Sequence, residues 1–238
     1  MLPTIKSLFV MFNRKTLSLF AAALIAALVF VAGSANAATL SGLALDGSDQ
    51  FQWPDAPLIG GQEQFDTSMS ATSGRDVKDN RDQGQSFTIT QTGTLDSVAF
   101  NFHAFSSSGT ANFTWNFFKV VSATDSTMVG SVIDSLTVTA SDLTNLGFSD
   151  DDKGTLVFDV VDTSVTADDV YAIQLDTDSG TDHIVKWRRD NSGYTGGEAF
   201  GNESVADDYY AAAYAVPEPA SLAMGLFGLA LIAGRRRR

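Results

Sequence analysis

Apolar and polar residues alternate one by one through most of the chain between residues 85 and 215. The alternation is clearest in three runs, whose apolar members are Phe113, Trp115 and Phe117, then Leu156, Phe158 and Val160, then Tyr171, Ile173 and Leu175. A period of two places these side chains on one face of an extended chain, so each run predicts a strand with one buried face. The region lacks the 3.6-residue periodicity of an amphipathic helix. This pattern restricts the fold to the all-β class.

The predicted strands are short and follow one another closely. They comprise residues 86–90, 95–105, 111–121, 128–133, 135–139, 156–160, 171–175, 183–189 and 209–214. Gly, Ser, Asp and Asn residues separate them, as is typical of turns between antiparallel strands. The sequence therefore predicts an antiparallel β-sandwich or jelly roll of about nine strands over residues 85–215. Residues 142–148 predict a single helical turn, and the polar residues 38–84 predict long loops with one or two short strands.

Residues 1–37 have the layout of a secretory signal peptide. Three basic residues precede an apolar run at residues 17–31, and the small residues Ala35 and Ala37 then form a signal-peptidase cleavage site. The apolar run is short for a retained transmembrane anchor, which is the less favoured interpretation. We therefore expect an N-terminal signal helix that signal peptidase removes during export.

The last 23 residues form a tail of a different kind. It consists of the motif Val216, Pro217, Glu218 and Pro219, the apolar residues 220–233, and the basic cluster Arg235, Arg236, Arg237 and Arg238. The two prolines disfavour a helix across the motif. A helix of 14 residues is about 21 Å long, shorter than the roughly 30 Å hydrocarbon core of a bilayer. Arginines favour the cytoplasmic side, so the tail predicts a short, transient transmembrane helix with the body facing outward.

This tail resembles the PEP-CTERM sorting signal, which is found on exported proteins of Gram-negative bacteria that make exopolysaccharide. The resemblance covers residues 216–238, and Ala220-Ser221-Leu222 directly after the motif also fits it. It implies that an exosortase recognises the motif, cleaves near it, and releases or transfers the body. The expected location is then the cell surface or the extracellular matrix, with the membrane involved only through the tail before processing. An ordinary C-terminal membrane anchor is the alternative.

The residues between signal and tail are strongly acidic. They include 8 basic and 27 acidic residues, a net charge of −19. Such a body repels nucleic acid and anionic membranes, so binding to either is not expected. The chain has no cysteine, which excludes disulfides, thiol catalysis and cysteine-ligated zinc.

Two kinds of candidate binding residue lie in the predicted loops and strands. Asp150, Asp151 and Asp152 are consecutive, and carboxylates in loops are suitable ligands for calcium. Solvated acidic turns are the simpler interpretation of the same residues, and no other cofactor is expected. The candidates for contact with a sugar are Tyr194 in a glycine-rich segment, Trp53, and Arg188 in the basic cluster of residues 186–189.

The sequence shows no G-x-S-x-G, H-E-x-x-H or P-loop motif, and we predict no catalytic residue. The body is similar to jelly-roll domains that often precede this tail, over residues 84–89, 93–95 and 194–200, which implies a carbohydrate-binding-like fold. We expect a non-enzymatic surface or matrix protein associated with exopolysaccharide or biofilm. A structural or adhesive protein-binding module, stabilised by calcium, and a secreted glycan-active enzyme are the alternatives.

Overall fold

The computed structural model describes residues 38–63, 74–78, 83–124, 127–177, 180–190, 194–201 and 208–216, all within the compact unit Ala37–Arg238. The predicted signal helix, the cleavage-site residues Ala35 and Ala37, and the apolar and basic parts of the tail lie outside these ranges. A search of the described residues finds no helix that is both long enough and apolar enough to cross a membrane.

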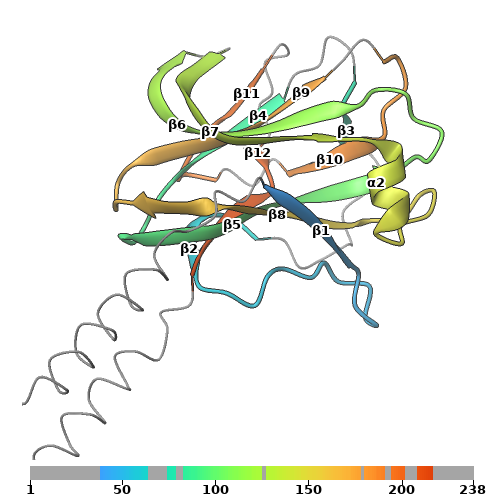
Figure 1. Ribbon diagram of the computed structural model, residues 1–238, viewed down its shortest axis with the longest axis horizontal. Coiled ribbons are helices and arrows are strands. Elements are labelled where there is room, and N and C mark those ends of the chain that lie inside the picture. Colours follow the sequence, from blue (N-terminus) through green and yellow to red (C-terminus); the bar gives the residue numbers. More distant parts are fainter. Residues whose placement is uncertain are drawn as a thin grey trace, which may run out of the picture. The chain divides into compact units, whose positions relative to one another are not determined.

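The described strands form two antiparallel sheets that lie one above the other (Figure 1). Sheet A contains β1 (Thr39–Ala44), β2 (Leu58–Gly61), β3 (Gly74–Asp76), β5 (Gly93–Phe105), β8 (Gly154–Val165), β10 (Val185–Asp190), β12 (Asp208–Tyr209) and β13 (Ala211–Ala215). Sheet B contains β4 (Gln83–Thr88), β6 (Phe113–Thr124), β7 (Thr127–Val138), β9 (Val170–Thr177) and β11 (Ala199–Gly201), in the spatial order β11-β4-β9-β6-β7. The all-β, two-sheeted antiparallel architecture predicted from the alternation is confirmed.

Aromatic side chains from both sheets meet in the core between them. Trp115 of β6 in sheet B stacks on Phe158 of β8 in sheet A, with ring centroids 4.3 Å apart and planes 4° apart. Phe158 stacks in turn on Phe100 of β5 at 5.9 Å. All three rings are fully buried, and burial of large aromatic surface is the main stabilising contribution available to a chain without disulfides.

Part of sheet A is buried on both faces, which the alternation did not predict. Its side away from sheet B carries a second apolar cluster, made of the buried residues Ala99, Val157, Ala212 and Tyr214 with Leu43, Trp53 and Ala56 packed against them. Trp53 and Ala56 belong to residues 45–57, the connection between β1 and β2, and Phe51 in the same connection is fully buried. This connection therefore covers the outer face of sheet A, and we call it the covering segment.

Local details differ from the predicted elements. The two strands expected at residues 128–133 and 135–139 are one strand, β7, because the alternation shifts there at a bulge rather than at a turn. Among the described residues, three short strands precede residue 83 instead of one or two, and ten strands, β4 to β13, follow against about nine expected. The predicted helical turn is α2 (Ala140–Asn145), whose N-terminus is capped by the Thr139 hydroxyl and the Asp142 carboxylate.

Candidate functional site

Two carboxylates of the acidic loop before β8 accept hydrogen bonds from backbone N–H groups. The Asp150 Oδ1 atom accepts the Ser107 backbone N–H at 2.6 Å, and the Asp152 Oδ2 atom accepts that of Ser149 at 2.7 Å. The bonds from Ser107 hold the pKa of the Asp150 carboxyl below its usual value. Asp151 lies between them with a φ of 66° and donates its N–H to the Phe105 carbonyl at 2.9 Å.

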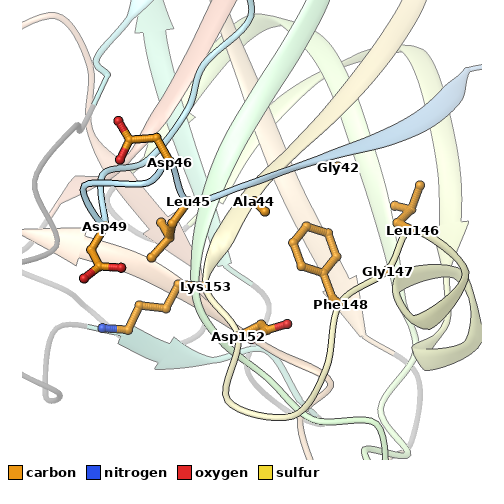
Figure 2. A pocket seen from close by; sticks show the side chains of 10 residues that line it. All are labelled: Gly42, Ala44, Leu45, Asp46, Asp49, Leu146, Gly147, Phe148, Asp152 and Lys153. Atoms are coloured by element: carbon orange, nitrogen blue, oxygen red, sulfur yellow. The ribbon is translucent and has the colours of Figure 1, made fainter.

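A cavity of about 320 Å³ opens beside this loop (Figure 2). Asp46 and Asp49, on the loop after β1, line it together with Asp152 and Lys153, while Phe148 contributes an apolar wall. The Asp46 Oδ1 atom already accepts the backbone N–H groups of Ser48 and Gln50, at 2.8 and 2.9 Å. Within the described ranges, no group of three or more His, Asp or Glu side chains is arranged to hold a metal ion.

The three residues predicted to contact a sugar lie in three different environments. Trp53 is half-buried and packs on the outer face of sheet A, whereas Tyr194 packs against the main core. Burial raises the pKa of the Tyr194 hydroxyl, which is hydrogen-bonded to the Gly61 backbone. The backbone N–H of Tyr194 donates to Asp208 Oδ2 at 2.9 Å. Arg188 is inside the protein rather than on its surface, with an exposed fraction of 0%.

Arg188 belongs to a polar cluster buried beneath the covering segment. Its Cζ atom lies 4.9 Å from the ring centroid of Phe51, and its Nη1 atom lies 3.4 Å from His103 Nδ1. Nearby on the same face, Asn101 donates to the Thr155 hydroxyl at 2.7 Å, and Thr155 donates to the Gln52 carbonyl at 2.5 Å. These contacts tie the covering segment to sheet A, so the cluster has a clear structural role.

A second charged group surrounds Asp76 at the end of β3. Its carboxylate lies 3.4 Å from both Lys78 Nζ and Lys186 Nζ, and 3.6 Å from His183 Nδ1. Burial raises the pKa of the Asp76 carboxyl, but the charges of His183, Lys186 and Lys78 outweigh it and hold the pKa below its usual value. Burial lowers the pKa of His183. This group could not be predicted from the sequence, because His183 and Lys186 are more than a hundred residues away from Asp76 and Lys78.

The solvent face of sheet B carries a third group, made of uncharged polar residues. Asn116 of β6 lies directly opposite Ser135 of β7 on one side and Gln174 of β9 on the other. We call Ser135, Asn116 and Gln174 the amide row. Asn116 and Gln174 are half-buried, and their side chains make no hydrogen bond to any residue that the structure describes. No motif distinguishes them in the sequence, where they occupy the polar positions of the alternation that predicted β6 and β9.

The first residue of the sorting tail is hydrogen-bonded to the folded body. Ala215, the last residue of β13, donates its N–H to the Pro57 carbonyl at 2.9 Å, and Val216 donates to the Thr94 carbonyl at 2.9 Å. Pro217, Glu218, Pro219 and the arginine cluster lie outside the described residues.

Comparison with known proteins identifies the tail. Residues 215–238 match the PEP-CTERM protein-sorting motif, which confirms the resemblance that the tail suggested. The motif indicates an exported protein that is sorted to the surface, and it implies processing by an exosortase. No curated protein matches the chain.

Proposed function

We propose that the body, from residue 38 to the sorting motif, is a non-enzymatic surface or matrix protein that associates with exopolysaccharide. The observation that carries this proposal is the position of the sorting motif, which follows the last strand of the folded body without a spacer. Removal of the tail after Val216 would leave every described strand in the body. Its net charge of −19 favours solubility in a hydrated matrix.

The non-enzymatic part of the proposal rests on how the titratable groups are used. His103 is 6% exposed and faces Arg188, while His183 faces Asp76. The loop carboxylates of Asp150 and Asp152 accept backbone N–H groups. A general acid or base must be within reach of a substrate, and these groups are instead engaged in holding the fold together.

Mass spectrometry of the mature protein from its producing cell tests delivery and processing. We expect an N-terminus near residue 38 and a C-terminus at or near Pro217 to Pro219, with the four terminal arginines removed. A mature protein that retains Arg235 to Arg238 would contradict processing at the motif.

Retention on exopolysaccharide tests the role of the body. The mature protein is passed over beads that carry exopolysaccharide from the producing cell, with uncoupled beads as the control. We expect retention on the coupled beads only. Equal passage through both columns would refute the association while leaving the sorting conclusion intact.

A further inference from the structure

The amide row lies at the centre of the solvent face of sheet B, which Figure 1 shows as the layer containing β4, β6, β7 and β9. Residues that lie directly opposite each other on paired antiparallel strands point to the same side of the sheet. The residues on either side of Asn116 along β6, Trp115 and Phe117, are fully buried in the core. The side chains of the amide row therefore point away from the core.

The row is bounded on both sides by residues of different character. On one side, Thr114 and Thr137 share a hydrogen bond between their hydroxyls at 3.1 Å. On the other side, Phe118 and Ala172 form an apolar cluster with Phe200. Hydroxyls, amides and apolar side chains thus follow one another across three successive rows of the same face.

The end of the row at β4 is closed by an aromatic ring. Gly84 of β4 lies opposite Gln174 of β9. A Cβ atom added to Gly84 would come within 2.1 Å of the Phe200 ring. The ring therefore lies over the backbone of Gly84, in the space that a side chain at this position would fill. Phe200 also packs edge-on against Phe118, with centroids 6.3 Å apart.

The amide row itself carries no charge, although the body as a whole carries a net charge of −19. The three members of the row are uncharged. The adjoining hydroxyl row contains one carboxylate among the described residues, that of Asp176 of β9, which lies opposite Thr114 of β6. Each side-chain amide offers two donors and an acceptor oxygen. The two amides here are half-buried, and no described residue uses them. A ligand with several hydroxyl groups, each of which both donates and accepts hydrogen bonds, matches these amides without a charged partner.

From this arrangement we propose that the amide row binds a stretch of neutral polysaccharide, with sugar hydroxyls hydrogen-bonded to Asn116 and Gln174. Sugar rings carry hydroxyls around their edges, which suits a row of amides that lies beside a row of hydroxyls. Adjacent strands are about 4.8 Å apart, so the row from Ser135 to Gln174 extends over roughly 10 Å, comparable with the length of a disaccharide. This proposal rests on the proposed association with exopolysaccharide and assigns it to a site.

Affinity electrophoresis of the mature protein tests the site. The gels contain exopolysaccharide from the producing cell, separated by anion exchange into a neutral and an acidic fraction. The double variant Asn116→Ala/Gln174→Ala removes both amides. Gln52→Ala is the matched control, because Gln52 is an exposed amide on the covering segment of sheet A. Thermal unfolding checks that each variant retains its fold, which we expect because the two amides have no partner to lose among the described residues.

We expect the neutral fraction to retard the wild-type protein and the control variant equally. The double variant should bind about tenfold or more weakly, since each neutral hydrogen bond contributes a factor of roughly 2 to 10 in affinity. Unchanged retardation of a folded double variant would overturn the site and leave the proposed function standing. Retardation by the acidic fraction alone would overturn the assignment of a neutral ligand. A wild-type protein that neither fraction retards would overturn the site together with the proposed function.

Discussion

Replacing Phe51 by alanine should detach the covering segment from sheet A. The Phe51 ring is fully buried and lies 4.9 Å from the guanidinium carbon of Arg188, which is also fully buried. Removing a buried phenylalanine side chain costs about 3–5 kcal/mol. About 2 kcal/mol of that loss is the interaction between ring and cation, because both groups are out of water. The free energy of unfolding should therefore fall by about 3–5 kcal/mol in Phe51→Ala.

Phe51→Leu separates the two contributions. Leucine keeps an apolar side chain of similar size but has no ring face for the cation, so we expect a loss of about 2 kcal/mol. Urea unfolding followed by tryptophan fluorescence measures both variants. For a body of this size, 1 kcal/mol corresponds to about 2–4 °C in melting temperature, so Phe51→Ala should melt about 6–20 °C below the wild type. A loss below about 1 kcal/mol in Phe51→Ala would show that the covering segment is not held at Phe51, since truncating a buried phenylalanine to alanine costs about 3–5 kcal/mol.

Three further predictions concern Gly61, the Asp150 carboxylate and calcium. Gly61 has a φ of 82°, and a Cβ atom there would lie 2.1 Å from the Ala211 carbonyl oxygen, so Gly61→Ala should lower the unfolding free energy by about 1–3 kcal/mol or more, as measured by urea unfolding. The folded-state pKa of Asp150 is lowered by the bonds from Ser107, so its contribution to stability is present above the unfolded-state pKa and is lost as the pH falls through the folded-state pKa. Asp150→Asn should therefore flatten the pH dependence of the melting temperature on the acidic side, and an unchanged profile would contradict this. Because Asp150 and Asp152 already accept loop N–H groups, calcium and a chelator should give the same melting temperature, and a rise with calcium would show that these carboxylates bind the ion instead.

The alternation in the sequence predicted the core well because strands bury every second residue. Phe113, Trp115 and Phe117 are all fully buried, as a period of two requires. The same reasoning assigns the polar positions to solvent, and on sheet B this holds for Thr114 and Asn116, which are half-buried on its outer face. Local pattern and tertiary structure agree wherever nothing else covers the sheet.

On sheet A the same reasoning failed for a physical reason. Asn101, His103 and Arg188 occupy polar positions of their strands, yet they are 0%, 6% and 0% exposed. The covering segment, about fifty residues away from β5 in the sequence, packs on Arg188 through Phe51 and is hydrogen-bonded to Thr155, the partner of Asn101, while His103 lies against Arg188. The pattern of apolar and polar residues within β5 or β10 contains no information about this contact with a distant segment. Arg188 was therefore interpreted as a surface residue, and the polar cluster around it was not predicted.

The pairing of β13 also indicates where the folded body ends and the tail begins. β13 pairs with β5 on one side and with β2 on the other, so it is an interior strand of sheet A. A cut within β13 would remove ladder hydrogen bonds from the middle of that sheet, whereas a cut after Val216 leaves every described strand complete. Interior strands open only together with much of the fold. The folded body thus restricts a protease to positions after Val216, and this is where the sorting motif continues with Pro217.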